Sequence, residues 1–251
     1  MTPSAVGIVV PARNEEAGIE PCLASLDRAA AVVARWGIGT FVVVAGDSCT
    51  DRTVELAARW LRDWKGTRKG GPEGLGGGTV IHLDARNVGA ARQAGMARLL
   101  RRYAALPPRR LWLASTDADT VVPHQWLARQ VRLAGAGWDA VAGVVAVDAW
   151  LGDHPDGLCS FEEAYGRRVD RLEHGHVHAA NLGLRASAYL AAGGFRPRRC
   201  GEDHDLWSRL DHPRLRRLSD PDLHVTTSGR LSGRAADGFS RDLADLDARH
   251  G

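Results

Sequence analysis

The segment VGIVVPARNEE (Val6–Glu16) joins a short apolar run to a polar, acidic stretch. The apolar part, Val6–Val10, is typical of a strand that is buried on both faces, and we expect Pro11 to end it. Beyond the acidic stretch, apolar residues recur at spacings of three and four, which predicts a helix with one apolar stripe. That stripe consists of Ile19, Leu23, Leu26, Ala30 and Val33.

The order of strand, polar turn and helix repeats through the first half of the chain. Further apolar runs at 40–46, 79–83 and 110–115 predict strands, and helical stripes follow at 54–64 and 88–99. Such alternation predicts a parallel sheet with helices on both faces. The second half is less regular. Its expected strands lie at 139–147 and 223–228, and its expected helices lie within 158–172 and 185–195, from 202, and after 237.

Acidic, polar stretches follow three of these strands. They are PARNEE (Pro11–Glu16), DSCTD (Asp47–Asp51) and STDADT (Ser115–Thr120). Ligands bind at the carboxyl ends of the strands in open parallel sheets, so we expect these stretches to form a single site.

Two aspartates, Asp117 and Asp119, are separated by one residue at the end of a strand. On an extended segment their side chains would point the same way. Two carboxylates at one place repel each other unless a cation or protons intervene, and Mg²⁺ or Mn²⁺ prefers oxygen ligands. The pair therefore suits a divalent metal held against a diphosphate. The alternative is a polar turn at a strand end.

Bulk properties exclude several classes of protein. The 251 residues are 44% hydrophobic and 25% charged, with a net charge of +3 and no dense basic run, so we expect no nucleic-acid partner. The four cysteines form no CxxC pair, which favours a reduced, cytosolic protein. We expect neither a signal peptide nor a transmembrane segment. The glycine-rich stretch 65–78 is interpreted as a surface connection, since no helix follows it.

Several motifs together resemble those of the family-2 glycosyltransferases with the GT-A fold. They are VVPARNEEAGIEPCLASL, VVVAGDSCTDRTVELA, NVGAARQAGMA, STDADT, GGF and EDHDLWSRL, in the family's order and rough spacing. The resemblance implies a GT-A αβα sandwich in a single domain, 1–251. A Rossmann-like nucleotide-binding half would span about 1–120, and a mixed-sheet acceptor half about 121–251.

The activity implied by this resemblance is transfer of a hexose from a nucleotide diphosphate sugar to a hydroxyl acceptor. Family habit favours a UDP-sugar donor, inversion of configuration and Mn²⁺ or Mg²⁺ as cofactor. The acceptor is a saccharide, a lipid-linked molecule or a small molecule, and a lipid acceptor would be met at the inner membrane face. The alternatives are a nucleotide-sugar-binding module without transferase activity and a nucleotidyltransferase on a related fold.

Matching the donor motifs residue by residue assigns a nucleotide site. Pro11, Ala12 and Glu15 match the segment under the base, although Glu15 also suits the dipole of a helix N-terminus. Asp47 matches an aspartate that commonly contacts the base. The preceding position is often a second acid, but here it is Gly46.

The remaining assignments concern phosphate and metal. Arg92 matches a residue beside the nucleotide, where it would neutralise donor oxygens; otherwise it is a solvated helix residue. Asp117 would contact donor and metal, and Asp119 would bind the metal. His224 matches a position that supplies a further metal ligand in some relatives, the alternative being an exposed histidine at a strand end.

The acidic motif GEDHDLW matches the family's catalytic segment. Asp203 is assigned as the base that removes the acceptor's proton, with Glu202 orienting it or contacting the acceptor. The alternative is a set of acids at a helix N-terminus. We expect Asp51 to be a helix cap and Trp207 to be a platform for the acceptor sugar. Histidines 174, 176 and 178 would hold zinc only on an extended segment.

Overall fold

A computed structural model describes residues 1–64, 76–147 and 177–228. One eight-stranded sheet in the order β3-β2-β1-β4-β7-β6-β8-β5 runs through both halves of the chain. The strands are β1 (Ala5–Ala12), β2 (Gly39–Asp47), β3 (Gly77–Leu83), β4 (Leu111–Ser115), β5 (Thr120–Val121), β6 (Ala140–Val147), β7 (Leu182–Arg185) and β8 (Arg217–Thr227). The helices are α1 (Ile19–Ala34), α2 (Thr53–Arg62), α3 (Val88–Arg102), α4 (Trp126–Gly135), α6 (Ala186–Ala191) and α7 (Glu202–Arg209).

The first half forms the predicted parallel sheet. β1 pairs in parallel with β2 and β4, and β2 pairs in parallel with β3. Because β2 and β4 flank β1 on opposite sides, the sheet has its topological switch point between β1 and β4. β7 then pairs antiparallel with β4 and β6, which makes the whole sheet mixed.

The end of β1 differs from its prediction, because the strand continues through Pro11 to Ala12. Both residues pair with β2, at Ala45 and Gly46. On the other side of β1, the ladder to β4 ends at Val9, whose carbonyl accepts from Thr116 N. Backbone groups point alternately to the two sides of a strand, so the missing N–H of Pro11 falls on the side where no ladder bond remains.

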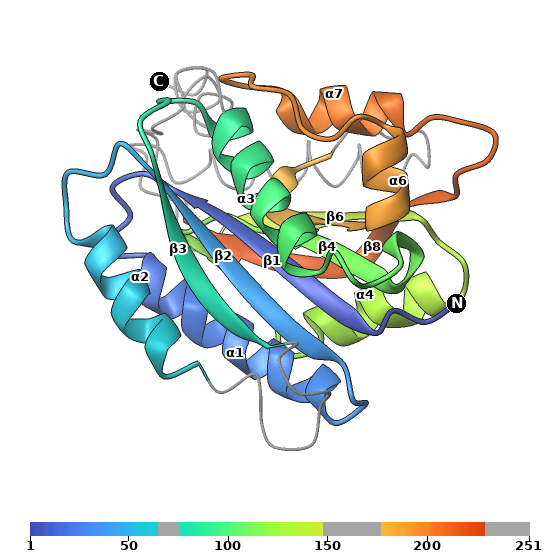
Figure 1. Ribbon diagram of the computed structural model, residues 1–251, viewed down its shortest axis with the longest axis horizontal. Coiled ribbons are helices and arrows are strands. Elements are labelled where there is room, and N and C mark those ends of the chain that lie inside the picture. Colours follow the sequence, from blue (N-terminus) through green and yellow to red (C-terminus); the bar gives the residue numbers. More distant parts are fainter. Residues whose placement is uncertain (65–75, 148–176, 229–251) are drawn as a thin grey trace, which may run out of the picture.

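Helices cover both faces of the sheet (Figure 1). α1, α2 and α4 enclose one apolar core, and α3, α6 and α7 enclose the other. The stripe predicted for α1 is buried along its whole length. Burying a large aliphatic side chain stabilises a fold by about 1.5–3 kcal/mol, so these faces fix the helices on the sheet.

The second half is more regular than its sequence indicated. Helix α4 had no counterpart in the prediction, and β8 begins well before the expected 223. A buried network joins these elements: Trp126 Nε1 donates to Asn181 Oδ1 (2.8 Å), and Asn181 Nδ2 donates to the carbonyls of Val144 (2.9 Å) and Leu223 (2.7 Å). α6 ends before Gly193 and Gly194, as predicted.

Some predictions lie outside the described residues. These are the helices within 158–172 and after 237, most of the glycine-rich stretch, and histidines 174 and 176. In the described part of the chain, no helix combines the length and apolar character needed to cross a membrane.

Candidate functional site

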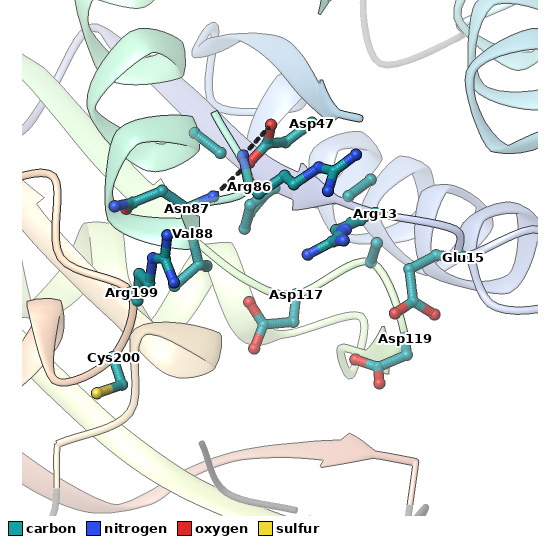
Figure 2. Close-up of a pocket in the computed structure, with 14 residues that line it drawn as sticks. Arg13, Glu15, Asp47, Arg86, Asn87, Val88, Asp117, Asp119, Arg199 and Cys200 are labelled. Carbon is teal, nitrogen blue, oxygen red and sulfur yellow. Dashed lines mark hydrogen bonds between the residues drawn. The ribbon is translucent and has the colours of Figure 1, made fainter. Parts of the chain in front are cut away.

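A pocket of about 540 Å³ lies at the carboxyl ends of β1, β2 and β4, beside the start of α3 (Figure 2). It coincides with the switch point of the sheet, where ligands bind in open α/β folds. It is lined by Pro11, Ala12, Arg13, Glu15, Asp47, Arg86, Asn87, Val88, Ala91, Asp117, Ala118, Asp119, Arg199 and Cys200.

The three acidic stretches therefore converge as predicted. Of the assigned residues, those that line the pocket are Pro11, Ala12, Glu15, Asp47, Asp117 and Asp119. Those that do not line it are Arg92, Glu202, Asp203 and His224.

Asp117 and Asp119 lie in a turn, so the expectation of an extended segment was wrong. Thr120 N donates to the carbonyl of Asp117 (3.1 Å), which closes the turn. The turn packs on the residue before α1, Gly18, where an added Cβ would lie 2.9 Å from the carbonyl oxygen of Ala118. The conformation thus follows from the close approach of the two segments, and both aspartates still face the same pocket (Figure 2).

The buried thiol of Cys22, on α1, lies beneath this acidic group. It donates to the carbonyl of Asp117 (3.3 Å). Burial raises the pKa of Cys22, and the negative charges of Asp119, Asp117 and Glu15 raise it further. The three carboxylates therefore act on the same buried thiol, which agrees with their places along one side of the pocket.

Hydrogen bonds tie the loop after β1 to the loop after β2. Asn14 Oδ1 accepts from Thr50 N (2.7 Å), and Asp51 accepts from Glu16 N (3.1 Å) and Thr53 N (3.0 Å). Asp51 bonds Thr53, the first residue of α2, but the N-cap position is Arg52 and no side chain makes a cap hydrogen bond there, so the prediction that Asp51 caps this helix was wrong. The carbonyl of Glu15 accepts from Gly18 N (3.1 Å) and Ile19 N (2.9 Å), so Glu15 begins the turn that leads into α1 and the helix-dipole alternative stays open beside its place in the pocket.

Asp47 holds the loop between β3 and α3. Its Oδ1 accepts from Ala85 N (2.7 Å) and Arg86 N (2.9 Å), and its Oδ2 accepts from Asn87 N (2.7 Å). Burial acts to raise the pKa of Asp47, but these bonds and one from Ser48 outweigh it and lower the pKa below its usual value. An acceptor position remains on Oδ2.

Gly46, the departure from the family's second acid, has a structural reason. A Cβ at this position would lie 2.7 Å from a methyl carbon of Val54. Packing of α2 against β2 therefore leaves no room for an acidic side chain.

Arg92 is buried, so the interpretation as a solvated helix residue was wrong. Its guanidinium donates to Glu202 (3.0 Å), Ser115 (2.9 Å) and Asp117 (2.6 Å). Burial alone would lower the pKa of Arg92, but Asp117 and Glu202 outweigh it and raise the pKa, so the side chain stays cationic. Arg92 thus joins a pocket aspartate to the acidic motif on α7.

The two acids of that motif differ in environment. Glu202 is buried, which raises its pKa; the charge of Arg92 opposes this rise and that of Asp203 adds to it. Asp203 is partly exposed, and its carboxylate accepts from Ala179 N (3.0 Å) and His204 N (2.8 Å). Both lie in the first turn of α7, so the alternative of acids at a helix N-terminus describes their position but not their different partners.

Two further assignments fit the structure poorly. His224 is exposed on β8, and Thr227 is the β8 residue that contacts Asp119 (3.4 Å). In the described ranges, no group of three or more His, Cys, Asp or Glu side chains is placed to hold a metal ion, so His224 does not complete such a group with the aspartates. Trp207 is buried beneath the Arg217 guanidinium, so the prediction of a sugar platform was wrong.

The prediction missed three arginines and the residue that caps α3. Arg13, Arg86 and Arg199 line the pocket, and Asn87 caps α3 by accepting from Ala90 N (3.0 Å). The sequence could have predicted the cap, because Asn87 directly precedes a helical stripe. It could not have predicted the position of Arg199, since the loop that carries Arg199 reaches the pocket only through tertiary contacts.

The chain matches the model of the family Glycosyl transferase family 2 over residues 7–191. No sequence among curated proteins matches it. Among solved structures, S. aureus TarS 1–349 in complex with UDP-GlcNAc superposes with a TM-score of 0.61 at 14% identity, covering 98% of this chain and 66% of that one.

A second similar structure is the mannosyltransferase PcManGT from Pyrobaculum calidifontis in complex with GDP-Man and Mn²⁺. Its TM-score is 0.61 at 19% identity, covering 91% of this chain and 57% of that one. The likeness confirms the GT-A fold, and the chain spans about three fifths to two thirds of these neighbours' length.

Proposed function

This chain belongs to glycosyl transferase family 2, and on that basis we propose that it transfers a hexosyl group from a nucleotide diphosphate sugar to a hydroxyl acceptor. One observation carries the proposal: Asp47, at the end of β2, and Asp117 and Asp119, in the turn after β4, line one pocket at the switch point of a GT-A fold. The neighbours in complex with UDP-GlcNAc and GDP-Man support a nucleotide sugar as the donor.

The donor's base is proposed to lie beside Pro11, Ala12 and Asp47. Three backbone N–H groups already occupy acceptor positions of Asp47, which leaves Oδ2 with room for one more donor. Uracil carries an imide N–H and guanine a lactam N–H, and either can donate to this oxygen. The proposal therefore favours a UDP- or GDP-sugar, with UDP favoured by family habit.

A divalent cation, Mn²⁺ or Mg²⁺, fits the acidic side of the pocket. Asp117 commits one oxygen to Arg92, so its other oxygen and the carboxylate of Asp119 are the proposed ligands. Mg²⁺ is often held by one or two carboxylates together with substrate phosphates. Two aspartates are therefore enough for this role, although the described residues hold no group of three or more potential metal ligands. When bound, the cation would supply Lewis-acid stabilisation of the departing diphosphate.

Asp203 is proposed to take the proton from the acceptor hydroxyl. The acceptor oxygen then bonds to the anomeric carbon, the bond from that carbon to the diphosphate oxygen breaks, and the configuration inverts. Glu202 is committed to Arg92, so we assign it the task of orienting α7. The first turn of α7 also favours ionised carboxylates, because the helix dipole is positive there.

Calorimetry on Asp119→Ala tests this function. The unaltered protein is expected to bind a UDP- or GDP-sugar much more tightly with Mn²⁺ than with EDTA. Asp119→Ala should lose most of the affinity gained from Mn²⁺ and keep the weak affinity in EDTA. Asp63→Ala is the control, since that exposed aspartate directly follows α2 and lies outside the pocket.

Unchanged metal-dependent affinity in Asp119→Ala would contradict the metal assignment. Hydrolysis of the donor that depends on Mn²⁺ would separate a transferase from a module that only binds. Release of pyrophosphate from a nucleoside triphosphate and a sugar phosphate would instead identify a nucleotidyltransferase.

A further inference from the structure

We infer that Arg13, Arg86 and Arg199 form a diphosphate subsite that acts beside the metal ligands. The pocket should therefore bind pyrophosphate and nucleoside diphosphates even when no metal is present. The inference rests on the proposed function, because it assigns the cationic side of the same pocket to the donor's diphosphate.

The three arginines come from separate loops. Arg13 follows β1, Arg86 precedes α3, and Arg199 precedes α7, yet all three line the pocket (Figure 2). Within the described structure, none of the three guanidinium groups takes part in an ion pair, unlike Arg196 and Arg198, which both pair with Asp205 (3.2 and 3.1 Å). Like charges around one cavity repel each other, and a multiply charged anion removes that cost.

Backbone contacts fix the position of Arg86. Arg86 has a φ of 48°, a left-handed conformation that is uncommon outside glycine, asparagine and aspartate. The bonds from Ala85 N, Arg86 N and Asn87 N to Asp47 hold the loop in this shape. Strained residues of this kind persist only where surrounding bonds enforce them, and they concentrate at ligand sites.

Long-range contacts bring Arg199 to the pocket. Gly89 N donates to the carbonyl of Arg198 (3.0 Å), and Asn87 Nδ2 donates to that of Pro197 (3.1 Å). The approach requires glycine, because a Cβ on Gly89 would lie 2.3 Å from the carbonyl oxygen of Arg196. Tertiary contacts thus place the loop against α3, with Arg199 at the pocket.

The chemistry of the ligand follows from the two sides of the pocket. Glu15, Asp117 and Asp119 provide the acidic side, while the arginines and the N-terminal turn of α3 at Val88 provide the cationic side. Guanidinium groups bind phosphate oxygens through paired N–H donors, and helix N-termini favour anions. A diphosphate presents enough charged oxygens to contact both the cationic side and a metal, whereas a nucleoside presents none.

The test is calorimetry in EDTA and in Mn²⁺ with pyrophosphate, UDP, GDP, uridine and guanosine. Arg86→Gln and Arg199→Gln are compared with Arg62→Gln, an exposed arginine at the end of α2 outside the pocket. In EDTA, each pocket variant should lose about tenfold or more in affinity for pyrophosphate, since a hydrogen bond to a charged group is worth about 1.5–3 kcal/mol. The control should match the unaltered protein, and thermal midpoints verify folding.

The outcomes separate this inference from the proposed function. Diphosphate affinities that are the same in the pocket variants as in the control, with and without Mn²⁺, would overturn the subsite while leaving the donor assignment in place. Loss of pyrophosphate binding in those variants supports the subsite. If the unaltered protein bound pyrophosphate and nucleoside diphosphates in this way but neither bound nor hydrolysed a nucleotide sugar under any condition, the subsite would stand and the proposed function would fail.

Discussion

Single residues in this site have roles that depend on their partners. The sequence assigns Asp47 to the nucleotide site. In the structure, its carboxylate accepts three hydrogen bonds from the backbone of the loop that carries Arg86. Glu202 and Asp203 are neighbours in sequence, yet one is buried against Arg92 and the other bonds Ala179 N. Residue type therefore predicts membership of a site better than it predicts the task within it.

Asp203→Asn tests the assignment of the base. The substitution preserves size and removes basicity, so sugar transfer should fall by about 10²–10⁴-fold while donor affinity stays nearly constant. Steady-state transfer is measured once an acceptor is found, together with donor affinity. Asn keeps only one of the two oxygens that accept from Ala179 N and His204 N, so a purely structural role predicts a lower thermal midpoint without a selective loss of transfer.

Glu202→Gln is the comparison for this experiment. A smaller loss is expected, because Glu202 acts through Arg92. If Glu202→Gln abolished transfer and Asp203→Asn did not, the two roles would be reversed. If neither variant lost transfer, the base would lie outside this motif.

At the scale of helices and strands, local pattern predicted most of the first half. The sequence predicted the apolar stripe of α1 and the strands β1–β4, because each of these elements buries a recognisable run or stripe of apolar residues. Helix α4 was missed although Leu127, Val131 and Ala134 form an apolar stripe. A polar turn at Asp117 was only the alternative expected from the sequence, because the shape of this stretch depends on close approach to Gly18. Distant contacts of this kind leave no local signal.

Gly89→Ala tests how the loop before α7 is held. The added Cβ would meet backbone atoms of Arg196 and Arg198, so the loop should leave α3. We expect faster tryptic cleavage after Arg198 and Arg199 and weaker binding of pyrophosphate. Gly135→Ala, at the end of α4, is the matched control, because its nearest contact is the Thr2 hydroxyl oxygen at 3.2 Å. Equal cleavage rates in the two variants would mean that the loop tolerates the methyl group.

At the scale of the whole molecule, one sheet joins the first half of the chain to the second, and one buried side chain joins the pocket to the acidic motif on α7. Arg92 extends from α3 to Ser115 at the end of β4, to Asp117 in the turn that follows, and to Glu202 on α7. Placing a cation between two acids satisfies charges that would otherwise be buried unpaired. The resemblance assigned Arg92 to the donor site, but only the fold shows that it also contacts the acidic motif on α7.

Two substitutions of Arg92 separate its charge from its geometry. Arg92→Met leaves Glu202 buried without a cation, so the free energy of unfolding should fall by about 3–5 kcal/mol, the usual cost of breaking a buried pair. Adding Glu202→Gln should restore part of that loss, since the unpaired charge is then gone.

Arg92→Lys keeps the charge but lacks the planar donors that reach three partners. It should remain more stable than Arg92→Met and still lose Mn²⁺-dependent donor affinity, because Asp117 is no longer held. Urea unfolding measures the stability of each variant, and calorimetry measures its donor affinity. Normal donor affinity in a folded Arg92→Lys would show that the site requires only the positive charge and not the contacts to three partners.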